Sequence, residues 1–269
     1  MTELADKKEK LFIIKIGGNV IDNESNLDSF LGDFSKIKSK KILVHGGGKI
    51  ATGIGDKLNI QSKYIDGRRI TDDETIDLVT MVYGGLVNKK IVAKLQSMHC
   101  NAIGITGADA NLLPAKKRPV REIDFGWVGD VSPENINSNT WKLFLENDLT
   151  LVTAPLTHDN EGHILNTNAD TITSVIAVSL SAIYEVNLVF CFEKNGVLLD
   201  VNDEDSVIQQ LNHEKYKLLK ESNKLFAGIL PKIDNAFDAI NKGVKEVIIG
   251  NSSQLISLIS GKGGTKISM

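Results

Sequence analysis

Short apolar runs alternate with segments of helical periodicity along the chain. Compact apolar runs at about 11–16, 42–45, 101–106, 149–153, 187–192 and 246–249 predict buried strands. Apolar residues at helical spacing predict helices over about 27–38, 50–58, 72–95, 169–180, 214–221, 231–241 and 254–259. Because helices and strands alternate, we expect an α/β fold, a three-layer α/β/α sandwich around a mostly parallel central sheet.

Two regions add detail to this pattern. Segment 116–131 has little helical periodicity and predicts β-hairpins that project from the sheet, and 159–162 predicts a further hairpin turn. Thr71 and Glu74 have the spacing of a capping box, which predicts that the third helix starts with Thr71 as its N-cap. Gly84 and Gly85 lie inside that helix at a cost of roughly 1 kcal/mol each. Such a pair is typical of close packing against another helix, and it marks a candidate subunit interface.

Composition and charge exclude several classes of protein. The net charge of −3 gives no support for a nucleic-acid partner, which usually requires a basic stripe. The longest apolar stretches are too short to span a bilayer, and the first ten residues lack the apolar core of a signal peptide. Two distant cysteines, Cys100 and Cys191, favour neither a disulfide scaffold nor a zinc site, and Cys191 is expected to be a small buried hydrophobe. We expect a cytoplasmic protein without a membrane partner.

Glycine clusters follow the first two predicted strands. Gly17 and Gly18 come after the first strand, and 46–48 is a run of three glycines after the second. Glycine lets the backbone approach an anion, and the start of a helix offers unpaired N–H groups and a favourable dipole. Lys15 is placed to reach the bound phosphate, although an ordinary βα turn with a surface lysine is an equally good interpretation of this segment. His45 is expected to be structural. Neither cluster is a P-loop or a dinucleotide fingerprint.

Further polar residues stand at predicted helix starts. Arg69 is suited to bind a substrate carboxylate, with a solvated arginine as the alternative. Asn168 is a natural N-cap that places Asp170 in the first turn, and capping is the structural alternative to a role for Asn166, Asn168 and Asp170 in the site. Lys232 opposes the dipole of its helix, which makes sense if it faces a nucleotide phosphate.

These segments together resemble the amino acid kinase family, and within it the members that phosphorylate N-acetyl-L-glutamate in arginine biosynthesis. The resemblance runs from about 11 to 267 and rests on Lys15-x-Gly-Gly, His45-Gly-Gly-Gly, Gly67-x-Arg69-x-Thr71, Asn166-x-Asn168-Ala-Asp170 and Lys232. It implies that Lys15 and Lys232 stabilise the transition state and that Asp170 organises them. The implied substrate contacts are Gly47, Gly48, Arg69, Asn166 and Asn168, and the implied phosphate contacts are Gly17, Gly18 and Gly46.

The resemblance also implies a reaction and a domain organisation. A single domain, 1–269, would have an N-terminal lobe at about 1–166 for the acylated amino acid and dimerisation, and a lobe at about 167–269 for ATP. The side-chain carboxylate of the substrate would attack the γ-phosphorus of ATP, which enters with Mg²⁺, and no protein metal site is expected. This is a phosphotransferase reaction with a carboxyl group as acceptor.

Several alternatives stay open at this point. N-succinyl-L-glutamate is an alternative substrate, and another family activity or a non-catalytic sensor are alternative functions. Segments 193–196 and 227–231 depart from the family pattern on the nucleotide side. About ten residues precede the first strand, too few for the long N-terminal helix of arginine-inhibited relatives, so we expect a homodimer that is insensitive to arginine.

Overall fold

The computed structural model of the 269-residue chain describes residues 8–65, 67–222, 224–225 and 229–269. The strands are β1 (Lys10–Ile16), β2 (Lys40–His45), β3 (Tyr64–Ile65), β4 (Arg68–Arg69), β5 (Ala102–Ile105), β6 (Ala115–Lys117), β7 (Gly129–Val131), β8 (Thr150–Thr153), β9 (Leu156–His158), β10 (Ile164–Asn166), β11 (Glu185–Phe192), β12 (Gln210–Leu211), β13 (Glu246–Asn251) and β14 (Thr265–Ile267). The α-helices are α1 (Gly18–Ile21), α2 (Glu24–Lys36), α3 (Gly48–Lys57), α4 (Asp73–Val79), α5 (Asn88–Ser97), α6 (Ser138–Glu146), α7 (Ala169–Leu180), α8 (His213–Glu221), α9 (Leu230–Asn241) and α10 (Leu255–Ile259).

A mostly parallel sheet forms the centre of the molecule, as predicted. Within the described residues, eight strands join in the order β12-β14-β13-β11-β1-β2-β8-β5, and β13–β14 is the antiparallel pair. The register of β1 and β2 pairs Ile16 with His45, the last residue of each strand. The two glycine clusters, which follow these residues directly, therefore leave the same edge of the sheet side by side.

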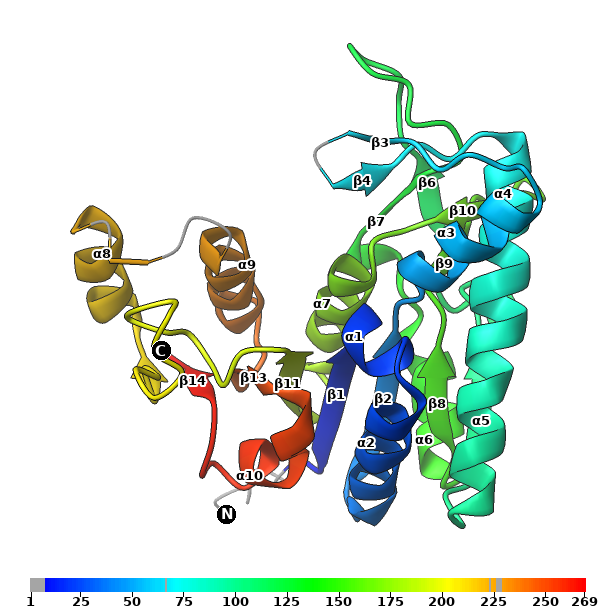
Figure 1. The fold of residues 1–269 in the computed structure, drawn as a ribbon. Coiled ribbons are helices and arrows are strands. Elements are labelled where there is room, and N and C mark those ends of the chain that lie inside the picture. Colours follow the sequence, from blue (N-terminus) through cyan, green and yellow to red (C-terminus); the bar gives the residue numbers. More distant parts are fainter. Residues whose placement is uncertain (1–7, 66, 223, 226–228) are drawn as a thin grey trace.

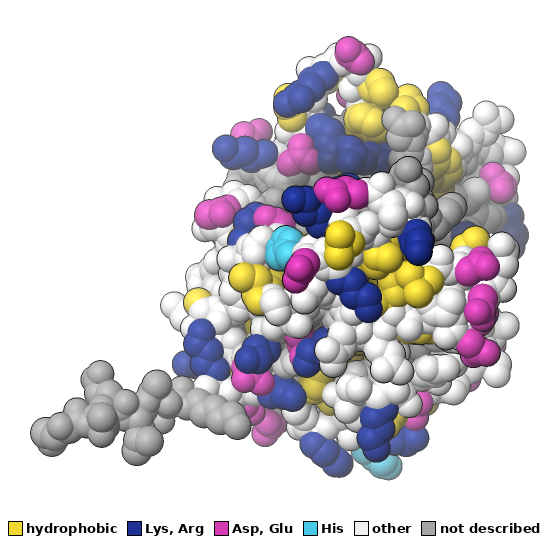
Figure 2. All heavy atoms as spheres, turned by 90° about the vertical axis from the view of Figure 1, so that its left-hand side faces the viewer, with side chains coloured by type: hydrophobic (Ala, Val, Ile, Leu, Met, Phe, Trp, Pro, Cys, Tyr) yellow, Lys and Arg dark blue, Asp and Glu magenta, His cyan; other side chains and the backbone are white. Residues whose placement is uncertain are grey.

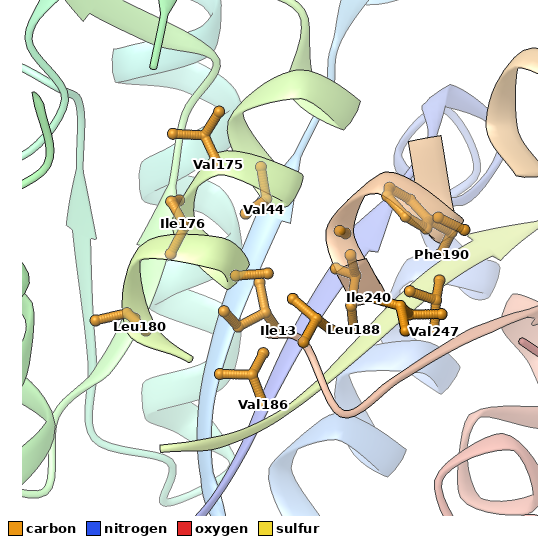
Figure 3. Packing of buried hydrophobic residues seen from close by; sticks show 14 of the residues in the cluster. Ile13, Val44, Val175, Ile176, Leu180, Val186, Leu188, Phe190, Ile240 and Val247 are labelled. Carbon is orange, nitrogen blue, oxygen red and sulfur yellow. The ribbon is translucent and has the colours of Figure 1, made fainter. Parts of the chain in front are cut away.

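Helices cover both faces of this sheet, which confirms the three-layer prediction. On one face, Val175 and Ile176 of α7 pack over Ile13 of β1 and Val44 of β2 (Figure 3). The same core includes residues of α6 and α9. On the other face, α2, α5 and α10 contribute to a second core around buried residues of β1 and β2. Each fully buried Leu, Ile, Val or Phe side chain contributes about 1.5–3 kcal/mol, so the two cores fix the strands that carry the site.

The start of α4 differs from the capping-box prediction. Asp72, not Thr71, is the N-cap, and its side chain accepts a hydrogen bond from the Thr75 backbone N–H at 3.0 Å. The backbone of Thr71 is instead paired with the segment around Gly126, donating to the Phe125 carbonyl and accepting from Trp127. This pairing holds Thr71 in an extended connection, so the helix begins one residue later.

The predicted long helix is interrupted at its centre. Residues Thr80–Val87, which include Gly84 and Gly85, form a π-helical segment between α4 and α5. Because a π-helix has more residues per turn than an α-helix, the apolar positions are rotated. Tyr83 and Val87 are buried, whereas Leu86, predicted on the apolar face, is 50% exposed. The prediction was wrong for Leu86 because its α-helical spacing does not apply across this segment.

The hairpins lie beyond the carboxyl ends of the central strands. Strands β6 and β7, and β9 and β10, form the predicted antiparallel pairs, and β3 and β4 form a further one. Figure 1 shows β3, β4 and β6 at the top of the molecule, past the ends of β1 and β2. Helix α6, which buries Trp141 completely, and the short strands β3, β4, β12 and β14 were not predicted from the sequence.

Two expectations from composition can be compared with the structure. Cys191 is fully buried, and burial raises the pKa of its thiol to about 12, which agrees with its predicted role as a small hydrophobe. Among the described residues, no helix combines the length and the apolar content needed to cross a membrane. On the face drawn in Figure 2, basic and acidic side chains are interspersed.

Candidate active site

Two lysines and one aspartate meet at the carboxyl edge of the sheet. Lys15 comes from the end of β1, Asp170 from the first turn of α7 and Lys232 from the first turn of α9. The Lys15 Nζ lies 2.8 Å from one carboxylate oxygen of Asp170, and the Lys232 Nζ lies 3.9 Å from the other. The structure thus brings together the three residues predicted as catalytic, which are up to 217 positions apart (232 − 15).

Lys15, Asp170 and Lys232, which we call the triad, carry two positive charges and one negative charge. Asp170 is stabilised by the N-terminal dipole of α7 as well as by the lysines. Burial and the neighbouring charge of Lys15 lower the pKa of Lys232, with burial the larger cause, while Asp170 opposes the shift. Two cations share one anion, so the triad keeps a net positive charge and suits an anionic ligand.

The ring of Phe192 completes the surroundings of both lysines. Its centroid lies 3.5 Å from the Lys232 Nζ and 5.8 Å from the Lys15 Nζ. Sequence reasoning missed Phe192, although it is the last residue of β11, the strand paired with β1. The rule that open α/β sheets bind ligands at the carboxyl ends of their strands could have identified it.

A first cavity, of about 420 Å³, opens on the β11 and β13 side of the triad. Apolar side chains and the first glycine cluster share its wall with charged groups. Its lining residues are Lys15, Gly17, Gly18, Val20, Cys191, Phe192, Glu193, Lys194, Gly196, Leu198, Val201, Ile229, Lys232 and Ile249. This combination suits a ligand with a flat apolar part and an anionic tail.

A second cavity, of about 640 Å³, opens on the side of the hairpins. It is lined by the second glycine cluster, three arginines and several amides. The lining residues are Gly46, Gly47, Gly48, Tyr64, Gly67, Arg68, Arg69, Tyr83, Arg118, Val128, Pro155, Asn166, Thr167, Asn168, Ala169, Asp170, Thr171, Lys232 and Asn235. Lys232 lines both cavities, Lys15 the first and Asp170 the second, so the triad stands where the two cavities meet.

His45 anchors the second glycine cluster and is structural, as expected. Its ring is completely buried, with Nδ1 2.7 Å from the Gly46 carbonyl oxygen and Nε2 3.1 Å from Nδ2 of Asn88. Burial lowers the pKa of His45 to about 4, so the ring is neutral at pH 7 and can donate through Nδ1 while Nε2 accepts from Asn88. The buried Asn88 also donates to the Val152 carbonyl at 2.9 Å. No motif or spacing in the sequence pointed to Asn88.

Two glycines of this loop, Gly47 and Gly48, differ in what a side chain at their position would meet. Gly47 has a φ of +147°, and a Cβ there would lie 3.0 Å from the ring of Tyr83. Gly48 starts α3, and a Cβ there would meet no protein atom within 4 Å. A side chain at Gly48 would therefore project into open space beside the second cavity, where a ligand can approach.

Arg69 is held by the protein rather than solvated. Its side chain is buried, and it donates to the Gly48 carbonyl at 2.9 Å and to the Thr52 hydroxyl at 3.0 Å. The guanidinium also bonds the Ser62 hydroxyl and lies 4.8 Å from the ring centroid of Tyr64. Arg69 therefore connects the β3–β4 hairpin to the glycine loop on the wall of the second cavity.

The two predicted amides stand beside the triad in different roles. The Asn166 amide donates to the Thr71 hydroxyl at 3.0 Å. Asn168 caps α7, accepting from the Thr171 N–H at 3.0 Å, which agrees with the capping alternative. Both line the second cavity, so capping and contact with a ligand are compatible.

Comparison with known proteins agrees with this geometry. Residues 10–251 match the model of the amino acid kinase family. This chain belongs to that family. An acetylglutamate kinase of Cytophaga hutchinsonii is 54% identical over 94% of this chain and 95% of the relative. An acetylglutamate kinase of Bacteroides fragilis is 51% identical over 97% of each chain.

Solved structures of other amino acid kinase folds superpose on nearly the whole chain. A protein from Streptococcus mutans, smu.665, is 26% identical with a TM-score of 0.75, covering 96% of this chain and 98% of its own. The carbamate kinase from Giardia lamblia bound to AMP-PNP is 15% identical with a TM-score of 0.72, covering 97% and 98%, and it supports the fold alone. The three-layer architecture is therefore that of the family.

The departures from the family pattern lie on the first cavity. Glu193 and Lys194 line it, and Lys194 is paired with Glu204 across the following loop. Of the second departing segment, residues 227 and 228 lie outside the described residues. The second cavity is lined by all five predicted substrate contacts, which are Gly47, Gly48, Arg69, Asn166 and Asn168.

Proposed function

We propose that this protein transfers the γ-phosphoryl group of ATP to the side-chain carboxylate of N-acetyl-L-glutamate, a step of arginine biosynthesis. The observation that carries the proposal is the placement of Lys15, Asp170 and Lys232 where the two cavities meet. Relatives about half identical over nearly the full chain, named acetylglutamate kinase, support the choice of substrate.

The residues of the site act through position and charge. The attacking carboxylate is ionised at pH 7, so no general base is needed. The difficulty of the reaction is to bring two anions together, and preorganised cations and N–H groups offset their repulsion. Lys15 and Lys232 stabilise the charge on the transferred group, and Asp170 holds the two ammonium groups in place.

The two cavities divide the substrates between them. The first, with its apolar wall and Gly17 and Gly18, takes ATP, and Mg²⁺ enters as part of that co-substrate. The second, with Gly47, Gly48 and the amides Asn166 and Asn168, takes the acylated amino acid. We propose that amino-acid binding falls mainly to about 1–166 and ATP binding mainly to about 167–269, with Gly17 and Gly18 of the ATP cavity before that boundary and Asn168 of the other cavity just past it.

N-succinyl-L-glutamate is a second candidate substrate, favoured by the arginines of the second cavity. An extra carboxylate needs a cationic partner, and Arg68 and Arg118 line the cavity in addition to Arg69. Arg118 is bonded through two of its nitrogens to Asp130, which fixes its direction. The two candidate substrates therefore differ in whether their acyl group carries a carboxylate for these arginines.

Assembly and location complete the proposal. We propose a cytoplasmic homodimer in which the π-helical segment contributes to the interface, because Met81 and Leu86 are 57% and 50% exposed there beside Gly84 and Gly85. Light scattering tests the dimer, and a monomer at micromolar concentration would contradict it.

A coupled assay of ADP release tests the reaction. The full chain is incubated with ATP and Mg²⁺ and, in separate reactions, with N-acetyl-L-glutamate, N-succinyl-L-glutamate, glutamate or aspartate. We expect turnover with an acylated glutamate and none with glutamate or aspartate. A clear preference for the succinyl compound would assign the second candidate function. No turnover with either acylated substrate would contradict the proposal.

A further inference from the structure

Phe192 lies beside both lysines of the triad but has no role in the proposed reaction so far. It ends β11, and its ring stacks on Phe190 of the same strand with centroids 6.3 Å apart and planes 19° apart. Phe190 pairs in register with Lys15 of β1 and belongs to the core on the α7 side of the sheet. The ring of Phe192 is therefore supported from the core.

The contacts of Lys232 are unusual for a lysine in an ion pair. Its Nζ lies 3.9 Å from the Asp170 oxygen, beyond hydrogen-bond length, and 3.5 Å from the centre of the Phe192 ring. An ammonium over an aromatic face is attracted by the ring quadrupole, more strongly where water is excluded. The Lys232 side chain is 36% exposed, so water is excluded from part of it.

An aromatic face holds a cation differently from a carboxylate. A carboxylate in a close ion pair draws the ammonium towards its oxygens, as Asp170 does with Lys15 at 2.8 Å. A ring face attracts the charge without an acceptor lone pair, so the N–H groups of Lys232 are available for other oxygens. Lys15 and Lys232 thus differ: the first is bound to Asp170, and the second is held near it.

We propose that Phe192 is a positioning residue for phosphoryl transfer, whose ring face holds the Lys232 ammonium at the junction of the two cavities with its N–H groups free for phosphoryl oxygens. This role rests on the proposed function of the site. It is specific to the charge distribution of the ring, because a side chain that acted by filling space alone would not depend on that distribution.

Fluorinated phenylalanines separate the two roles. We would place 4-fluoro-, 3,5-difluoro- and 3,4,5-trifluorophenylalanine at position 192 of the full chain, which weakens the negative ring face stepwise with little change of shape. We expect kcat to fall stepwise, reaching a loss of roughly fivefold to thirtyfold with the trifluoro residue or with Phe192→Leu. Phe192→Trp, which keeps an aromatic face, should retain most of the wild-type kcat. KM for the acylated amino acid should change little, since Phe192 does not line the second cavity.

Phe34 provides a matched control for this series. It lies on α2, and the Lys41 Nζ is 5.1 Å from its ring centroid, away from the site. The same fluorinated residues at position 34 should leave kcat unchanged. If fluorination at position 192 leaves kcat within about twofold while Phe192→Leu lowers it, Phe192 acts by packing alone and the proposal is overturned.

A measurement without turnover tests the contact directly. In protein labelled with ¹³C-lysine, the ring current of Phe192 should move the methylene protons next to the Lys232 Nζ upfield. The signal is assigned by its loss in Lys232→Arg, and its upfield position should disappear in Phe192→Leu. An unshifted Lys232 signal would overturn the inference even if the kinase assay succeeds. Conversely, a failed kinase assay with a shifted signal would reject the proposed function and leave the lysine–ring contact established.

Discussion

The two cavities meet at Lys232 but are built in opposite ways. In the second cavity several polar groups are already bonded to the protein, among them Arg69 to the Gly48 carbonyl and Asn166 to the Thr71 hydroxyl. In the first cavity the wall is largely apolar, with Leu198 and Ile249 among its residues, and Lys15, Lys194 and Lys232 are the cations that line it.

This difference shows how one site can accept two unlike ligands. Polar groups fixed by protein partners cost little to reorganise and discriminate strongly, because a wrong ligand leaves them unpaired. An apolar wall binds a flat group through burial and discriminates less. We infer that selectivity for the acceptor resides in the second cavity, and that the first contributes affinity and holds the phosphate chain. Substitutions in each cavity and at their junction test this contrast.

The largest expected effect concerns the lysines at the junction. Lys15→Ala and Lys232→Ala should each lower kcat by at least roughly 10²-fold, because each removes a cation that stabilises the transition state. Steady-state kinetics with ATP and the acylated glutamate give kcat directly. Unchanged kcat in either variant would refute the role of that lysine.

Lys36→Ala is the control for loss of a lysine. Lys36 is exposed on α2, is paired with Asp33 and lines neither cavity. Its replacement should leave kcat unaffected. A similar loss in this variant would mean that the kinetics report general damage to the protein.

Much of this arrangement could be predicted from the sequence, because the relevant signals are local. Apolar runs predicted the strands β1, β2, β8, β11 and β13, and the chain order predicted that they are mostly parallel. The glycine clusters and the first-turn aspartate then followed from the rule that strand ends and helix starts meet at one edge. Lys15, Asp170 and Lys232 became candidates in this way, and the resemblance to the family supplied their predicted roles.

The remaining features depend on contacts between distant segments. Asn88 is buried against His45, which lies 43 positions away in the sequence. Nothing in the sequence around either residue indicates this contact. The apolar residues of Thr80–Val87 have α-helical spacing in the sequence, although the segment is π-helical in the structure. The exposure of Leu86 could therefore not be predicted from that spacing. Phe192 was hidden in a run that predicted a buried strand.

An intermediate effect concerns the neutral histidine that anchors the second cavity. The pKa of His45 is lowered to about 4 in the folded protein from 6.5, so the unfolded chain binds a proton more readily. The contribution of neutral His45 to the free energy of unfolding is therefore fully present above pH 6.5, and it is lost as the pH falls towards 4. Between pH 7.5 and 5 the histidine alone should lower the free energy of unfolding by roughly 2 kcal/mol, a factor of about 30.

Urea unfolding of matched variants isolates this contribution. His45→Gln should lose that part of the pH dependence, whereas His99→Asn, at an exposed position outside the site, should keep it. If His45→Gln keeps the full pH dependence, the histidine is not buried as a neutral group, and the second cavity is not anchored as described.

The smallest kinetic effect concerns the glycines that border the second cavity. Gly47→Ala forces a side chain into a backbone with φ of +147° and towards Tyr83, and should cost roughly 1–3 kcal/mol of unfolding free energy. Gly48→Ala meets no protein atom within 4 Å and should change stability by less than about 0.5 kcal/mol. Both should nevertheless raise KM for the acylated amino acid, by about tenfold, because a methyl group keeps the ligand from the loop. KM for ATP should stay constant in both, since neither glycine lines the first cavity. If Gly48→Ala raised KM for ATP instead, the assignment of the two cavities would have to be exchanged.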